Sequence, residues 1–126
     1  LIADCCFLSG LAKIETTDET GTEQKKWRPA YLLHYIQDWY HEPDLLVDIS
    51  DVFEQRMKAI EAYSTQFNST DSKEPQTYIS TPDFLESVIA RARMFGKRIG
   101  VKYAEGFISE KKIGIRTLDA LIQNET

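Results

Sequence analysis

Side chains that can bind a small polar molecule stand at two junctions of this chain. Arg28 directly precedes an apolar run that begins at Ala30. An arginine held at the entrance of a strand can bind a carboxylate through two parallel hydrogen bonds, and a surface ion pair is the alternative interpretation. Tyr103 and Glu105 follow the glycines that end a predicted helix. Tyr103 can instead pack against the core, and Glu105 can instead form an ion pair.

The two histidines, His34 and His41, do not belong to a recognisable zinc motif. A zinc site needs about four ligands, and His34 and Asp38 would lie about 13 Å apart in an extended segment. The only cysteines, Cys5 and Cys6, are adjacent, so on a helix they point in different directions. This pattern favours free, buried thiols in a reducing, cytoplasmic compartment. We therefore predict no metal ligand set within this chain.

Charge and composition narrow the classes of partner. The formal net charge of −5 argues against nucleic acid or an anionic membrane surface as the main partner. The longest apolar runs, such as Leu45-Leu46-Val47, are far too short to cross a bilayer. One basic cluster can attract anions, or can be a solvated helix face that complements the helix dipole. It consists of Arg91, Arg93, Lys97, Arg98 and Lys102.

The 126 residues, 42% of them apolar, suit one ordinary globular domain. We expect an α/β fold in the order helix, two short strands, two helices, short terminal strand. The predicted elements are a core helix within 1–14, strands at 30–37 and 45–49, a helix from Ser50 or Asp51 to Phe67, a helix from Thr81-Pro82-Asp83 to Gly96 or Gly100, and a strand near 103–107. Exposed loops are predicted at 15–26 and 68–76.

Two further expectations concern the first half of the chain. The strand at 30–37 is apolar on both faces, which predicts a position inside a sheet that is covered on both sides. The apolar segment at Leu1 lacks the basic front of a secretory signal. We therefore expect its helix to start upstream, and the chain to be a piece of a longer protein.

Five runs of residues, taken together, resemble a known enzyme family. They are Arg28-Pro29-Ala30-Tyr31; His41-Glu42-Pro43-Asp44 leading into Val47-Asp48-Ile49-Ser50; residues 59–67; residues 88–97; and Tyr103-Ala104-Glu105-Gly106-Phe107. Their order and spacing resemble the C-terminal half of the LmbE/PIG-L family of zinc-dependent N-acetylglucosamine deacetylases, and most closely the bacillithiol-biosynthesis branch. The resemblance implies that residues 1–126 are the C-terminal half of a single deacetylase domain with a Rossmann-like α/β sandwich.

The family's zinc ligands come from a His-Pro-Asp-Asp-type motif and a His-x-x-His-type motif, neither of which occurs here. In the family, zinc polarises a water and the substrate amide, and an aspartate acts as the base. The resemblance thus implies a cytoplasmic hydrolase that removes acetyl from an N-acetylglucosaminyl conjugate. This chain would supply the substrate-side wall, with no catalytic residue and no metal ligand, and would be inactive alone. Its partners would be the glycoconjugate and the missing N-terminal half, and we expect a homo-oligomer.

The resemblance also implies specific substrate-binding residues. Arg28 matches an arginine that approaches the active site, and Tyr103 and Glu105 match a Tyr-Ala-Glu element near it. Phe84 stands where close relatives can carry a tyrosine that reaches the pocket, and Tyr78 is a candidate replacement for that hydroxyl. The alternative function is a non-catalytic α+β fragment that binds a partner or self-associates.

Overall fold

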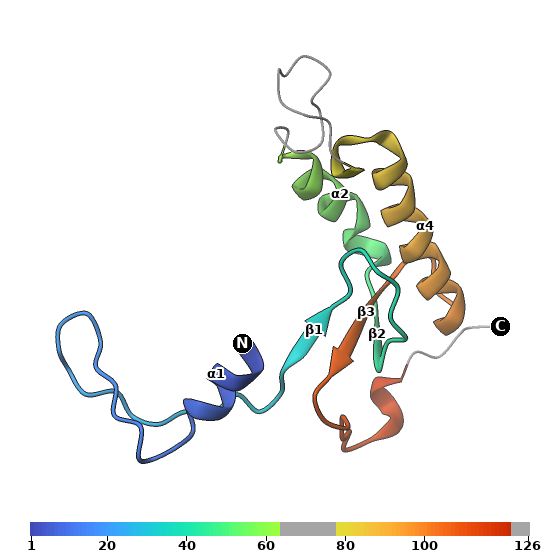
Figure 1. Ribbon diagram of the computed structural model, residues 1–126. Helices are drawn as coiled ribbons and strands as arrows, with labels where there is room; N and C mark the ends of the chain where they lie inside the picture. The colour runs from blue at the N-terminus through green and yellow to red at the C-terminus, as the bar shows by residue number, and fades with distance from the viewer. Residues whose placement is uncertain (64–77, 122–126) are drawn as a thin grey trace, which may run out of the picture. The chain divides into compact units, whose positions relative to one another are not determined.

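The computed structural model describes residues 1–63 and 78–121, which form two compact units (Figure 1). The smaller unit comprises Leu1–His34 and Ser109–Gly114. The larger unit comprises Tyr35–Ile108 and Ile115–Thr126. The predicted loop at 68–76 and the last turn of the predicted helix that ends at Phe67 lie outside the described residues.

Helix α1 of the smaller unit spans Ile2–Leu8, and none of its residues is buried. The prediction of a buried core helix is therefore wrong for the residues described, and the thiol of Cys5 is exposed. Apolar composition alone does not bury a helix, because burial requires a partner surface. The smaller unit, all of which the structure describes, contains no second helix against which α1 could pack.

The polar segment 15–26 is exposed throughout and folds back on itself. An isolated antiparallel bridge joins Thr17 to Glu23. Inside this turn, Oδ1 of Asp18 accepts hydrogen bonds from the backbone N–H groups of Thr20 and Thr22, at 2.8 and 3.0 Å. An Asp side chain that bonds its own backbone is a common turn device. The hydrogen bond that the Thr20 hydroxyl donates, and then these backbone bonds, hold the pKa of Asp18 below its ordinary value.

Three strands form one small sheet in the order β1-β3-β2. They are β1 (Leu33–Tyr35), β2 (Leu45–Asp48) and β3 (Ala104–Ser109). Strands β2 and β3 are antiparallel, with Leu46 opposite Gly106. The prediction that residues 30–37 form an interior strand is wrong within the described sheet. The terminal strand β3 takes the central position, so β1 is a short edge strand.

Helices α2 and α4 of the larger unit are each preceded by a short 3-10 turn, and a glycine ends α4. A 3-10 turn at Ser50–Val52 leads into α2, Phe53–Glu61. A second turn, Tyr78–Ser80, precedes α4, Pro82–Ile99. Gly100 ends α4 with φ of +76°, a left-handed conformation that favours glycine. Thr81 occupies the N-cap position, but its hydroxyl donates to the carbonyl of Tyr78 rather than capping the helix.

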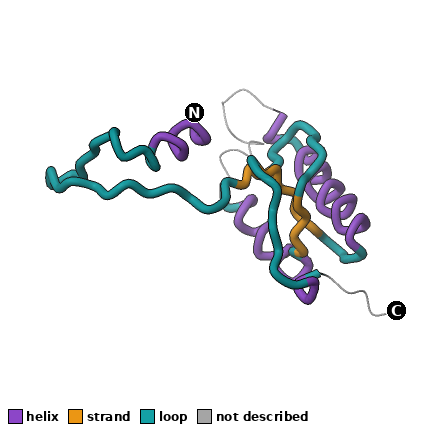
Figure 2. Tube along the Cα trace, turned by 90° about the horizontal axis from the view of Figure 1, so that it is seen from below, coloured by secondary structure: helices purple, strands orange, loops and turns teal. Residues whose placement is uncertain are grey.

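Helices α2 and α4 lie beside the sheet (Figures 1 and 2). Buried side chains from these elements and the segments next to them form the core. One buried cluster contains Ile49, Phe53, Ala92 and Tyr103. A second contains Ile36, Phe95 and Ala104. The buried side of α4 repeats at the three- and four-residue spacing of an amphipathic helix, at Val88, Ala92 and Phe95. The expected α/β class and order of elements are confirmed, and the Rossmann-like sandwich of a complete domain stays a prediction.

Candidate functional site

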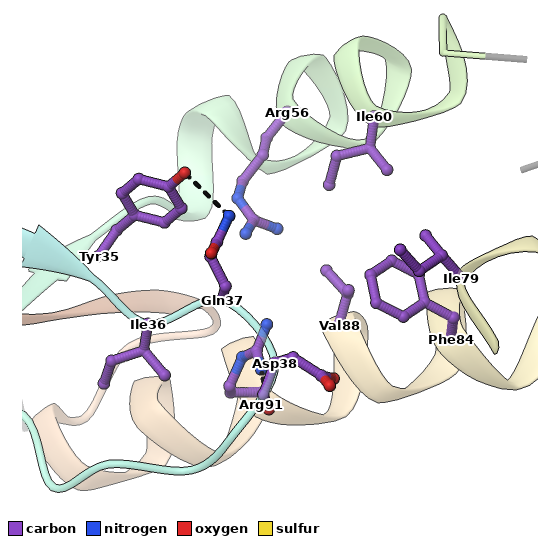
Figure 3. A pocket seen from close by; sticks show the side chains of 10 residues that line it. All are labelled: Tyr35, Ile36, Gln37, Asp38, Arg56, Ile60, Ile79, Phe84, Val88 and Arg91. Carbon is purple, nitrogen blue, oxygen red and sulfur yellow. Dashed lines mark hydrogen bonds between the residues drawn. The ribbon is translucent and has the colours of Figure 1, made fainter. Parts of the chain in front are cut away.

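The larger unit contains a cavity of about 370 Å³ (Figure 3). This volume lies within the range of small-molecule sites, roughly 300–1,000 Å³. Its apolar walls come from three parts of the chain: Ile36 after β1, Ile60 of α2, and the segment that contains Ile79, Phe84 and Val88. Polar side chains complete the lining, and the charged ones among them are Asp38, Arg56 and Arg91.

Helical spacing brings these side chains to the cavity. Arg56 and Ile60 are four residues apart on α2, so they share one face of that helix. Phe84, Val88 and Arg91 occupy one face of α4 in the same way. The third side is the irregular segment after β1. Its side chains are held partly by one another, since Nε2 of Gln37 donates to Oη of Tyr35 at 3.0 Å (Figure 3).

Two half-buried guanidinium groups dominate the electrostatics of the cavity. Nη2 of Arg56 lies 3.4 Å from Oε1 of Glu105 on β3. Nη1 of Arg56 is buried and has no hydrogen-bond partner among the described residues. Nη1 of Arg91 donates to the carbonyl of Asp38 at 3.1 Å. The pKa of Arg91 is lowered, because burial disfavours its charged form and because Arg56 repels it. The cavity therefore offers positive charge to an anion.

The structure places Tyr103 in the core rather than in this cavity. Its ring stacks on Phe53, with ring centroids 3.7 Å apart and ring planes 6° apart. Its backbone N–H donates to Oγ of Ser50 at 3.1 Å. The packing interpretation of Tyr103 is thus confirmed. Glu105 forms an ion pair with Arg56, which bears out the ion-pair interpretation, and it is not among the residues that line the cavity.

Tyr78 lies at the border of the cavity. Its ring stands edge-on to Phe84, with centroids 5.7 Å apart and planes 89° apart. Phe84 and Ile79 line the cavity, whereas Tyr78 is exposed and does not. The hypothesis that the Tyr78 hydroxyl replaces one missing at Phe84 stays a prediction.

Arg28 belongs to the smaller unit, where it is held against α1 rather than in a surface ion pair. Its Nη2 donates to the carbonyl of Phe7 at 2.8 Å, and its guanidinium carbon lies 4.8 Å from the centre of the Phe7 ring. Gly10 makes this position possible, because a Cβ there would lie only 2.5 Å from Nε of Arg28. The guanidinium borders a shallow hollow that Ala3, Cys6 and Pro29 also line.

The described residues do not fit a zinc centre. Nε2 of His34 pairs with Oε1 of Glu110 at 3.0 Å. Across residues 1–63 and 78–121, no group of three His, Cys, Asp or Glu side chains could hold a metal ion. The location of the family's zinc ligands outside this chain stays a prediction. In the same ranges, we find no helix with the length and apolar character needed to cross a membrane.

Sequence reasoning missed Arg56 and left two interpretations open for Arg91. The solvated-face interpretation does not hold for Arg91, because its side chain is half-buried and bound to a backbone carbonyl. The available signal was spacing: Arg91 follows Val88 and Phe84 on the buried side of a predicted helix. The same argument applies to Arg56, which lies three residues after Phe53 and four before Ile60, two apolar residues of the other predicted helix.

No family model matches the chain. Among solved structures, the chain is similar to the conserved protein TT1542 from Thermus thermophilus, with a TM-score of 0.70 and 27% sequence identity. The similarity covers 90% of this chain and 44% of that protein, so the chain spans less than half of its length. This likeness supports the mixed α/β fold and assigns no activity.

Proposed function

We propose that this chain is the substrate-side part of a zinc-dependent hydrolase that removes acetyl from an N-acetylglucosaminyl conjugate. The observation that carries the proposal is the cavity of about 370 Å³ with two guanidinium groups. The sequence runs that resemble the LmbE/PIG-L deacetylases overlap the end of α2 and the second half of α4, the two helices that line this cavity. Its size and mixed lining suit a compact glycoconjugate, since apolar side chains can contact the C–H face of a sugar while arginines bind oxygens.

The described residues would bind and orient the substrate. Because they do not fit a zinc centre, no step of the hydrolysis is assigned to them. Arg28, Tyr78 and Glu105 remain proposed substrate-side residues, and Tyr103 would support this wall from the core. Two further parts of the proposal are a cytoplasmic location, favoured by the free cysteines, and a homo-oligomer, favoured by exposed apolar side chains such as Trp39 at 81%.

The test uses the full-length protein encoded by the reading frame that contains this chain. Zinc content is measured together with the release of acetate and of primary amine from two N-acetylglucosaminyl conjugates, one with a carboxylate aglycone and one with an uncharged aglycone. We expect acetate and amine in equal amounts. Arg28→Ala should lower kcat/KM without lowering zinc content. Lys26→Ala is the matched control, because Lys26 is an exposed cation of the same segment.

Two results would contradict the proposal. A folded, zinc-loaded protein that releases acetate from neither conjugate would favour the non-catalytic binding module instead. Equal kcat/KM values for Arg28→Ala and the wild-type protein would remove Arg28 from the substrate site.

A further inference from the structure

The two arginines of the cavity reach it from separate helices. Arg56 extends from α2 and Arg91 from α4, and both extend toward the space beside the segment that follows β1 (Figure 3). Arg56 is close enough to disfavour the charged form of Arg91. Like charges that share a half-buried space are unfavourable unless an opposite charge lies between or beside them.

The described residues meet only part of this requirement. Among them, Glu105 is the one carboxylate with an ion pair to Arg56, and the 3.4 Å separation is long for a charged hydrogen bond. Arg91 donates to the carbonyl of Asp38, a neutral acceptor, and the nearby carboxylates of Asp38 and Glu105 also favour its charged form. Nη1 of Arg56 has no acceptor among the residues described. This atom is closed off from solvent, so an additional acceptor group would meet the other N–H groups of the two side chains, each of which has five N–H donors.

We infer that Arg56 and Arg91 together bind the carboxylate of a small, partly apolar ligand inside this cavity. Planar guanidinium groups match a carboxylate, which accepts parallel hydrogen bonds from them. Ile60, Ile79 and Val88 line the same space and can bury the apolar part of the ligand. This inference does not rest on the proposed deacetylase activity, because the cavity lies within the larger unit and binding can be measured without turnover.

The surrounding charges favour a carboxylate over a phosphate. The carboxylate of Glu105 lies on one side of Arg56, and the exposed carboxylate of Asp38 lines the cavity near Arg91. Both negative groups repel a second negative charge on the ligand. A phosphate monoester carries about −1.5 to −2 charges at pH 7, whereas a carboxylate carries one. A single negative charge therefore suits the site better.

A ligand-observed NMR titration of the full-length protein tests this inference. The protein is first stripped of metal ions with a chelator, so that a carboxylate cannot bind to a metal. The probes are 3-phenylpropionate, its neutral analogue 3-phenylpropionamide, and inorganic phosphate. We expect saturable binding of 3-phenylpropionate, at least tenfold weaker binding of the amide, and weaker binding of phosphate. Arg56→Gln and Arg91→Gln should each weaken binding of 3-phenylpropionate at least fivefold.

Lys97→Gln is the matched control, because Lys97 is an exposed cation of α4 that does not line the cavity. Its affinity for 3-phenylpropionate should equal that of the wild-type protein. If Arg56→Gln fails to fold, Arg91→Lys tests the site instead. This variant keeps the positive charge but loses the planar guanidinium, so it should bind 3-phenylpropionate at least threefold more weakly than the wild-type protein. Equal affinities for acid and amide, equal losses in Lys97→Gln, or an absence of saturable binding would overturn the inference. Tighter binding of phosphate would replace the carboxylate with a phosphate as the ligand group.

Discussion

Replacement of Gly106 by alanine should destabilise the protein, because β3 passes very close to the core at this residue. A methyl carbon on Gly106 would lie 2.9 Å from Cε2 of Phe95, 3.1 Å from Cβ of Pro43 and 3.2 Å from Cδ1 of Ile36. Favourable carbon–carbon separations are about 3.5–4.0 Å. Phe95 is only 2% exposed, so its ring cannot turn away into solvent. Gly106 also stands opposite Leu46 in the central strand, which restrains its backbone.

The expected loss follows from two opposing effects. Overpacking a core costs about 1–3 kcal/mol. Alanine in a strand is favoured over glycine by roughly 0.5–1 kcal/mol, because it loses less backbone entropy on folding. Gly106→Ala should therefore lower the free energy of unfolding by about 0.5–2 kcal/mol. Equilibrium urea denaturation measures this quantity, with the m value checked for constancy.

A double-mutant cycle with Phe95→Leu tests the cause. Leucine has no atom at the position of Cε2, so the double variant should be more stable than the sum of the single losses predicts, by about 0.5 kcal/mol or more. Gly114→Ala is the control, because no atom lies within 4 Å of a Cβ at Gly114. Its stability should change by less than about 0.5 kcal/mol. Strict additivity in the cycle, or a Gly106→Ala variant as stable as the control, would refute the reasoning.

Three more predictions concern single residues of the larger unit. Gly100→Ala should lower the free energy of unfolding, measured by thermal denaturation, by about 1–2 kcal/mol, because φ of +76° is unfavourable for residues other than glycine. Gly100→Asn should lower it less, since asparagine tolerates this conformation better. Hydrogen bonds from Arg98 and then Tyr40 hold the pKa of Glu42 at about 2, below the ordinary 4.5. Its contribution to stability is complete above about pH 4.5 and is lost as the pH falls toward 2. Glu42→Gln should accordingly flatten the pH dependence of the unfolding midpoint in that window, and an unchanged profile would exclude the contact. Tyr103→Leu removes the ring that stacks on Phe53 and should cost about 1–3 kcal/mol, with a loss of near-ultraviolet circular dichroism. Tyr103→Phe keeps the ring, so its free energy of unfolding should lie within about 1 kcal/mol of the wild-type value. A loss of stability in Tyr103→Phe as large as that in Tyr103→Leu would contradict a packing role.

Local patterns were sufficient to predict α4. Its first residue is Pro82, the residue that follows its end is Gly100, and Val88 and Phe95 lie on its buried side at helical spacing. Each of these signals acts within a few residues along the chain. Burial of α1 and the position of β1 depend instead on what covers them. An apolar run looks the same in sequence whether another strand or helix lies beside it or not, so both predictions were wrong within the described part of the chain.

The candidate site shows the same limit. Sequence identified Glu105 but left its ion pair as one of two interpretations, because its partner Arg56 comes from a distant segment. The convergence of Arg56 and Arg91 depends on how α2 and α4 approach each other, which the spacing within either helix does not encode. Sequence can therefore propose which side chains share a helix face, and tertiary packing decides which faces share a cavity.

The close approach of Gly10 to Arg28 has a consequence for how this chain can vary. Nε of Arg28 occupies the place that a Cβ of residue 10 would need. The atoms that would collide belong to the far end of a flexible side chain, so an alanine at position 10 would push the guanidinium away from α1 at little structural cost. Position 10 thus sets the direction of a cation that lies far from it in sequence: one added methyl group would redirect Arg28 while leaving its identity and the net charge untouched.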